Sequence, residues 1–147
     1  MTKSALLFSV IMFWAVLGCK NEPKSAVDVA YDNFYDSVMI IHDRTMPLMG
    51  QLESLRSRLQ DERRVVINSD TNRFRKVNRL LSELNKAEDA MFTWMNGFNP
   101  DTIANMEEKL NYIKSELSDV KHMEGLMLGG IGMAEQYLDE FAPEQSQ

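Results

Sequence analysis

Residues 34–59 read FYDSVMIIHDRTMPLMGQLESLRSRL, and this stretch decides the fold class. Apolar or small side chains recur in it at alternating four- and three-residue steps, which is the spacing of one face of an α-helix. Pro47 removes one backbone donor, so we expect a kink one turn upstream of it rather than the end of the helix. The positions on the apolar face are Phe34, Val38, Ile41, Thr45, Leu48, Leu52, Leu55 and Leu59.

Capping and helix-breaking residues mark the ends of the expected helices. The first helix is expected to begin after Ser25, whose hydroxyl can cap the first turn, with Asp28 near the positive end of the helix dipole. A second helix is expected over 71–96, after the polar residues 68–70, which favour a turn. Gly97 then offers a C-terminal stop.

The third expected helix is the least regular. Asn99 and Pro100 are read as its N-cap and first helical residue. Glu124 falls on its apolar face, where a hydrophobic residue is expected. Several glycines weaken this helix by about 1 kcal/mol each relative to alanine, so we expect a bend or a break near Gly129, with residues 131–141 as a fourth helix if it breaks. The sequence therefore predicts an all-α, up-down-up bundle of three long helices.

The first 18 residues predict an export signal. Lys3 precedes an apolar run over 5–17, which is shorter than the about 20 residues that span a bilayer but suits the core of a signal peptide. The run ends in Val16-Leu17-Gly18-Cys19, which resembles the lipobox of bacterial lipoproteins. This resemblance implies removal of the signal peptide 1–18 and attachment of fatty acids such as palmitate to Cys19. A plain secretory signal with an incidental cysteine is the alternative.

The residues around Cys19 also indicate a location and a domain layout. Lys20 occupies the position where inner-membrane retention signals often carry aspartate, so we expect an outer-membrane lipoprotein of the cell envelope, facing the periplasm or the cell surface. Residues 19–25 are read as the lipidated cysteine and a polar tether, 26–141 as the helical bundle domain and 142–147 as a disordered tail.

Charge is distributed unevenly along the 147 residues, whose net charge is −6. Residues 56–79 hold eight basic and three acidic side chains, a net of +5, whereas residues 101–147 hold three lysines and ten acidic side chains, a net of −7. Because residues 60–70 connect the first two helices, the basic side chains are expected at one tip of the rod, at the end opposite the lipid. The candidate partner-binding residues, called here the basic cluster, are Arg56, Arg63, Arg64, Arg73, Arg75, Lys76 and Arg79.

The basic cluster has two interpretations. It can engage an anionic component of the envelope, such as anionic lipid, lipopolysaccharide phosphates or an acidic segment of an envelope protein. Nucleic acid is a remote partner for an exported lipoprotein. Alternatively, the arginines form ordinary surface pairs with acidic side chains of the third helix.

One histidine and several methionines form the only pattern with chemical content. If the first two helices pair antiparallel, residue 42 lies opposite residue 91, and a tight second turn brings Met106 to the same level. Thioether and imidazole donors suit Cu(I), and a b-type haem with His and Met ligands is a further use of such a bundle. The alternative is core packing, because methionine fills irregular apolar space. The candidate ligands are Met39, His42, Met46, Met91, Met95 and Met106.

Other chemistries lack the residues that they need. A single cysteine excludes a disulfide framework and multi-cysteine metal sites. Asp119 and His122 have carboxylate–histidine spacing, but a di-iron bundle needs two such motifs and two further carboxylates. His122 is also expected about 24 Å above the level of Met106, at 1.5 Å per residue, so the two histidines should not share a site. The sequence therefore favours a non-enzymatic protein.

Two strings carry a family resemblance. They are His42-Asp43-Arg44-Thr45-Met46-Pro47-Leu48-Met49-Gly50 and Ala87-x-x-Ala90-Met91-x-x-Trp94-Met95. Together they resemble a group of small uncharacterised Gram-negative lipoproteins, some of which carry the name "viral A-type inclusion protein". The resemblance implies a lipid-anchored helical protein and supplies no activity. The sequence thus predicts an interaction or spacer module of the envelope, and heptads of this length could also pair with a second copy of the chain.

Overall fold

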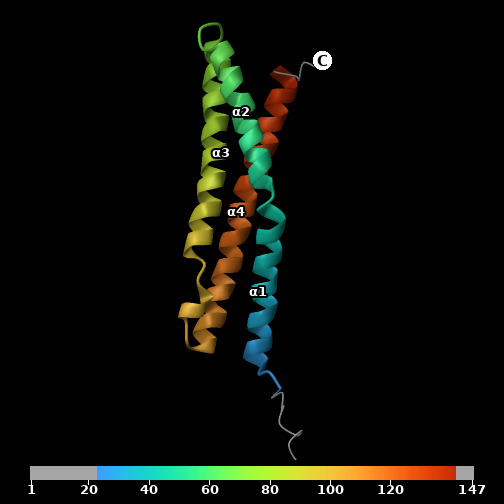
Figure 1. Ribbon diagram of the computed structural model, residues 1–147, viewed down its shortest axis with the longest axis vertical. Coiled ribbons are helices and arrows are strands. Elements are labelled where there is room, and N and C mark those ends of the chain that lie inside the picture. The colour runs from blue at the N-terminus through green and yellow to red at the C-terminus, as the bar shows by residue number, and fades with distance from the viewer. Residues whose placement is uncertain (1–22, 142–147) are drawn as a thin grey trace, which may run out of the picture.

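The computed structural model describes residues 23–141, and over this range the chain forms helices and no strand (Figure 1). The predicted signal peptide, Cys19 and the tail 142–147 lie outside the described residues. The elements are α1 (Ala26–Thr45), α2 (Leu48–Val66), α3 (Thr71–Gly97), the 3-10 helix η2 (Pro100–Thr102) and α4 (Met106–Phe141).

These helices form an up-down-up bundle, as predicted. α1 and α2 follow one another in the same direction as one bent rod, α3 returns beside α2, and α4 runs beside both halves of the first rod (Figure 1). The lower part of the bundle therefore consists of α1, α3 and α4, and the upper part of α2, α3 and α4. The N-terminal end of α1 and the turn between α2 and α3 lie at opposite ends of the molecule.

The first rod bends at Pro47 without reversing its direction. Met46 and Pro47 both keep right-handed helical backbone angles, with φ of −54° and −61°. The regular ladder is replaced there by a tighter bond, in which the Met49 amide donates to the Met46 carbonyl at 3.2 Å. This outcome confirms the prediction of a kink rather than an end, because proline removes one donor but tolerates the helical φ. The predicted position one turn upstream is wrong, since α1 stays regular to Thr45 and the interruption lies at Met46 and Pro47.

Capping residues determine where the helices begin. Ser25 and Asp28 form a reciprocal capping box at the start of α1, as the sequence indicates. Asp70 caps α3, since its carboxylate accepts hydrogen bonds from the amides of Asn72 and Arg73, both at 3.0 Å.

The expected start of the third helix at Asn99 and Pro100 is wrong. Pro100 opens η2, and the side chain of Asn105 caps α4 by accepting from two amides of its first turn. The Tyr112 hydroxyl holds the connection, accepting from the Asn99 amide at 2.9 Å. α3 ends at Gly97, as predicted, but not through a left-handed residue, because no described glycine has a positive φ and Phe98 is the C-cap.

α4 continues through its glycines as one helix, so of the predicted bend or break near Gly129 the break is wrong. The neighbouring Gly130 is buried against α3, where an added Cβ would lie 3.5 Å from the Glu83 carbonyl oxygen. Packing of α4 along both other rods offsets the about 1 kcal/mol that each glycine costs in a helix. One long helix is therefore retained.

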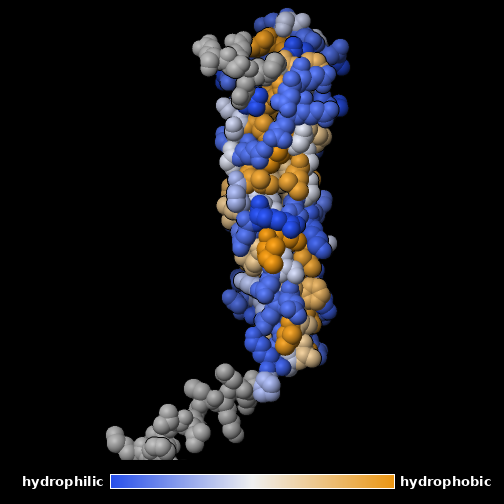
Figure 2. Space-filling model, turned by 90° about the vertical axis from the view of Figure 1, so that its right-hand side faces the viewer, coloured by the Kyte–Doolittle hydropathy of each residue, from blue (hydrophilic) through white to orange (hydrophobic). Residues whose placement is uncertain are grey.

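The core follows the three apolar faces. The predicted face of the first rod is buried, with Phe34 and Leu48 packing at its margin. On the face shown in Figure 2, orange apolar patches alternate with blue charged residues along the rod. None of the helices within residues 23–141 combines the length and the apolarity that a membrane span requires.

Candidate functional site

Contacts between helices establish which residues lie at the same level of the rod. The first rod, α1 with α2, runs parallel to α4: the Lys114 ammonium lies 5.5 Å from the centre of the Phe34 ring of α1, and the Gln51 amide of α2 donates to Glu135 at 2.6 Å. These pairs are 80 and 84 positions apart in sequence. α3 runs antiparallel to α4, with Glu83 beside Gly130.

Trp94 of α3 lies about midway along the rod, where it contacts both His42 and Phe98. Its side chain is 91% buried, since 9% remains exposed. The indole lies 5.4 Å from the His42 ring of α1 and stacks on Phe98 at 4.9 Å between centres. The prediction that His42 faces α3 near residue 91 is therefore confirmed to within one helical turn.

A small hollow opens beside this aromatic stack. It has a volume of about 190 Å³ and is lined by Met39, His42, Trp94, Met95 and Phe98. Three of the six candidate ligands thus come together here, from two helices. The lining is mainly apolar, and its possible ligand atoms for a small soft cation are two thioether sulfurs and one imidazole nitrogen.

The imidazole of His42 has one ring nitrogen engaged. Its Nδ1 lies 3.0 Å from the Asp43 carboxylate, a contact that favours a proton on Nδ1. A proton there leaves Nε2 as the free acceptor or ligand atom, which is the arrangement that carboxylate–histidine pairs supply in metal sites. Within residues 23–141, no three histidine, cysteine or acidic side chains converge to hold a metal, so such a site would depend on the methionines.

The other three candidate ligands lie elsewhere. Met91 is fully buried in the core, and Met46 is exposed at the α1–α2 bend. Met106 begins α4 at the lower end of the rod, three residues before Lys109, whose ammonium lies 5.2 Å from the Tyr31 ring centre. It is therefore about 20 Å below His42, at 1.5 Å per residue.

The misplacement of Met106 has a structural cause. The prediction assumed a tight turn after α3, but η2 and the extended residues around it let α4 begin below the end of α3 (Figure 1). This shift brings His122, rather than Met106, to the level of His42. The expectation that the two histidines lie far apart in height is therefore wrong, although they line different hollows.

His122 belongs to a larger groove on the other side of Trp94, between α3 and α4. The groove has a volume of about 530 Å³, and its lining combines apolar side chains with three carboxylates and one lysine. Sequence reasoning missed it because it depends on the register of α4. Its lining residues are Lys86, Asp89, Ala90, Thr93, Trp94, Gly97, Glu116, Asp119, His122 and Met123.

Glu124, unexplained by the sequence, joins α4 to α1. Its carboxylate accepts two hydrogen bonds from Arg44, at 2.5 and 2.7 Å, and lies 3.5 Å from the Thr45 hydroxyl. The bonds from Arg44 hold the pKa of the Glu124 carboxyl below its usual value. Glu124, the polar residue on the apolar face of α4, thus contacts Thr45, the polar residue on the apolar face of α1. The ion pair between Glu124 and Arg44 is structural, because it joins the two helices.

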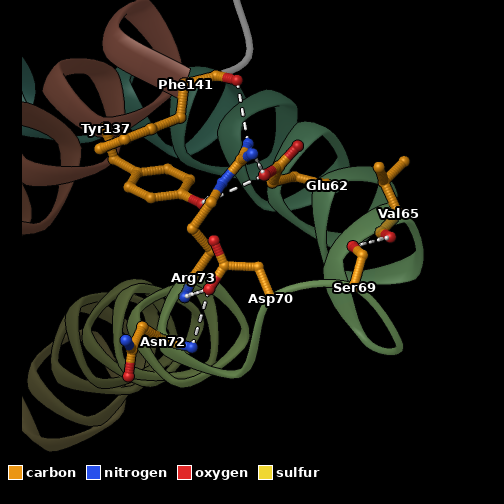
Figure 3. Close-up of polar contacts among 8 residues, drawn as sticks. All are labelled: Glu62, Val65, Ser69, Asp70, Asn72, Arg73, Tyr137 and Phe141. Carbon is orange, nitrogen blue, oxygen red and sulfur yellow. Dashed lines mark hydrogen bonds and ion pairs between the residues drawn. The ribbon is translucent and has the colours of Figure 1, made fainter.

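At the upper end, an arginine of the basic cluster is enclosed by the three helices. Figure 3 shows Arg73 of α3 between Glu62 of α2 and the end of α4. Arg73 pairs with Glu62, whose side chain is only 7% exposed, and donates to the Phe141 carbonyl at 3.0 Å. The Tyr137 hydroxyl donates to Glu62 at 3.1 Å, and burial raises the pKa of Tyr137. This network fastens α4 to the α2–α3 hairpin.

Part of the basic cluster is therefore engaged within the bundle. Arg56 pairs with Glu53 and with Glu88 of α3, at 2.5 Å for the latter, and Arg64 pairs with Asp61. The partners are acids of α2 and α3, so the expectation of pairing with acids on the third helix is wrong. Because the acids of 101–147 lie along the whole of α4, few of them reach the hairpin.

The remaining residues of the basic cluster differ from these arginines in having no acidic partner among the described residues. Within residues 23–141, no acidic side chain lies within ion-pair distance of Arg63, Lys76 or Arg79, and Arg75 bonds only to the neutral Asn72. Two aliphatic side chains accompany them: Val65 is 70% exposed and Ile67 is 52% exposed. We call residues 63–76 the α2–α3 tip.

Comparison with protein-family models, curated protein sequences and solved structures found no match. The candidate functional features are therefore the two hollows beside Trp94 and the α2–α3 tip.

Proposed function

We propose that this protein is a lipid-anchored, non-enzymatic helical-bundle lipoprotein of the outer membrane, which acts as a spacer and interaction module of the cell envelope. One observation carries the proposal: the chain enters the bundle at one end of the rod, and the part of the basic cluster that has no acidic partner among residues 23–141 lies towards the other end. Residues 26–66 alone span about 60 Å at 1.5 Å per residue. An anchor at Cys19 would therefore hold the α2–α3 tip well away from the membrane.

The placement of the interior carboxylates supports a structural role. Glu62 and Glu124 face the bundle interior, and each pairs with an arginine of another helix. Such pairs fix the arrangement of helices rather than leave a proton donor or acceptor for a substrate. The surfaces left for function are then the exposed ones, above all the α2–α3 tip.

The anchor is tested by metabolic labelling. Cells producing the full chain are given a labelled fatty acid, and the label on this protein is compared with that on the Cys19→Ser variant. We expect label on the wild type only, with the wild type in the outer-membrane fraction. Label that persists in the variant would refute attachment at Cys19, and an unlabelled wild type would refute the lipoprotein proposal.

A second candidate function is binding of Cu(I) in the hollow beside Trp94. The observation that favours it is the convergence of Met39, His42 and Met95 on one hollow. Soft thioether donors select Cu(I) over harder cations. Its volume of about 190 Å³ is below the roughly 300–1,000 Å³ of organic cofactor sites, so the same observation argues against a b-type haem.

The copper candidate is tested by competition with a colourimetric Cu(I) chelator under reducing conditions, with residues 20–147. Stoichiometric withdrawal of copper that is lost in His42→Ala and weakened in Met39→Leu and Met95→Leu would establish the site. Met46→Leu and Met106→Leu are matched controls, because neither methionine lines the hollow. No withdrawal, or equal loss in the controls, would make these side chains core packing.

A further inference from the structure

We propose that the α2–α3 tip docks on the phosphate-bearing surface of an anionic bilayer, with Val65 and Ile67 entering between the headgroups. The inference rests on the proposed function, because it names the partner of the interaction module. Among the anionic components that the basic cluster could bind, it selects anionic lipid.

The apolar part of the tip is presented outward. Val65 and Ile67 are 70% and 52% exposed, while Val66 between them is 1% exposed and anchors the turn to the core. Val65 points away from the Glu62, Arg73 and Tyr137 network in Figure 3. Two aliphatic side chains this exposed at the end of the rod bury little area in the core, and they suit the boundary between headgroups and acyl chains.

Basic residues flank these two residues along the chain. Arg63 and Arg64 precede them on α2, and Arg75 and Lys76 follow on the first turns of α3, all within about 8 Å of the helix ends at 1.5 Å per residue. Arg63 and Lys76 have no acidic partner among the described residues, and Arg64 is held only by the exposed Asp61. Cations beside an inserted apolar pair are placed where lipid phosphates lie.

Part of the backbone of the turn is already hydrogen-bonded within the protein. The amides of Ser69 and Asp70 donate to the Val66 carbonyl, at 3.2 and 3.0 Å, and the Ser69 hydroxyl donates to the Val65 carbonyl at 3.1 Å. Peptide groups without partners are costly in the apolar part of a bilayer. The turn can therefore approach the interface without losing hydrogen bonds to water at these positions.

The shape of the tip favours a bilayer over other polyanions. A nucleic acid supplies phosphates but no hydrocarbon layer beneath them for Val65 and Ile67. A protein partner would need a concave apolar pocket with an acidic rim. A bilayer offers a layer of phosphates with hydrocarbon beneath it, which matches the basic and the apolar side chains of the tip. The Glu62–Arg73–Tyr137 network holds the turn in place on the side that faces the bundle.

The test is capture of one vesicle by another. The full chain, purified in detergent from bacterial membranes, is inserted into immobilised donor vesicles of phosphatidylcholine. Fluorescent acceptor vesicles contain either phosphatidylcholine alone or phosphatidylcholine with phosphatidylglycerol. We expect capture of the anionic acceptors only. Failure of the chain to remain in the donors contradicts the anchor, whereas a chain that remains there but captures no acceptors overturns the docking proposal alone.

Two double variants and their controls test whether the tip side chains are responsible for vesicle capture. We expect Val65→Ser with Ile67→Ser to lower capture about tenfold, through loss of apolar burial, and Arg63→Gln with Lys76→Gln to lower it at least about tenfold. Matched controls are Ile40→Ser with Leu128→Ser, which are exposed away from the tip, and Lys114→Gln with Lys121→Gln. Equal losses in the controls would overturn the assignment to the tip.

Three further outcomes would contradict the proposed roles of charge, apolar insertion and the bilayer. Capture of neutral acceptors as strong as that of anionic ones would overturn the role of the basic side chains. Full capture by the Val65→Ser, Ile67→Ser variant would overturn insertion. Binding of soluble polyphosphate without capture of any vesicle would show a polyanion site instead of a membrane site, and would also overturn the proposal.

Discussion

The middle of the rod and the α2–α3 tip use arginine in different ways. In the middle, Arg44 pairs with Glu124 across two helices, and Arg56 pairs with Glu88. At the tip, Arg63 and Lys76 have no such partner within residues 23–141, and apolar side chains next to them are exposed. The arginines in the middle are thus engaged in ion pairs that hold the helices together. The charges of Arg63 and Lys76 at the tip are available to a binding partner. Substitutions should separate the two groups by their effects on stability.

The largest loss is expected where the two regions join, at Glu62. Glu62→Ala leaves Arg73 without its acid beneath the end of α4 and removes the acceptor of the Tyr137 hydroxyl. Breaking a buried pair on one side costs about 3 kcal/mol. Urea denaturation measures the loss, and Arg63→Ala on the next residue is the matched control. A loss under about 1 kcal/mol would mean that the network does not fasten α4.

Removal of Glu124 should cost less, because Arg44 is more exposed than Arg73. We expect Glu124→Ala to lower the free energy of unfolding by about 1–2 kcal/mol, from lost charged hydrogen bonds. The variant Glu124→Leu tests the assignment further, since an apolar residue here matches the α4 face but leaves Arg44 unpaired. A neutral effect of both variants would make the pair incidental.

The contribution of Glu124 should depend on pH in a defined direction. Its pKa is held below the ordinary value of 4.5, mainly by hydrogen bonds from Arg44. The stabilisation is therefore complete above the unfolded pKa and is lost as the pH falls through the folded one. The stability difference between the wild type and Glu124→Gln should be constant above about pH 5.5 and shrink on acidification. A difference that grows on acidification would contradict this assignment.

The stack beside Trp94 should contribute a smaller amount. His42→Ala removes one ring from the contact with the indole and is expected to cost about 1 kcal/mol without metal. The melting temperature of the wild type and the variant, each with and without Cu(I), distinguishes packing from ligation. A stabilisation by Cu(I) that only the wild type shows would favour the metal site, and its absence from both would favour packing.

The smallest effects are expected at the exposed basic residues of the tip and at Arg79 just beyond it. Arg63→Ala, Lys76→Ala and Arg79→Ala should each change the free energy of unfolding by no more than about 0.5 kcal/mol, because exposed side chains without partners add little to stability. Denaturation in urea checks each variant. A loss above about 1 kcal/mol at any of them would mean that the side chain is part of the fold, and the contrast with Arg44 and Arg56 would fail there.

Local periodicity was enough to predict the helices, because it depends on neighbouring residues. The face from Phe34 to Leu59, the cap at Ser25 and the span of α3 all follow from spacing and capping chemistry. The start of α4 was mispredicted because Pro100 fits a 3-10 turn as well as a helix start. Helix type and direction were therefore accessible from sequence, and the exact start of α4 was not.

The candidate site was only partly accessible, because it depends on the register between helices. The approach of His42 to α3 followed from antiparallel pairing across a short turn. The level of α4 could not be predicted, since the eight residues between Gly97 and Met106 can displace it by many ångströms. That displacement separates Met106 from His42, brings His122 to Trp94 and sets Glu124 against Arg44.

The most direct test of the account is the spacing between bilayers in electron cryomicrographs of the captured vesicles. A rod anchored at its N-terminal end and docked by the α2–α3 tip should hold the membranes about 60–80 Å apart, from 1.5 Å per helical residue and a short extended tether. Spacing in this range that is lost with the tip variants supports the account. Membranes in direct contact, or the same spacing with the tip variants, would contradict it.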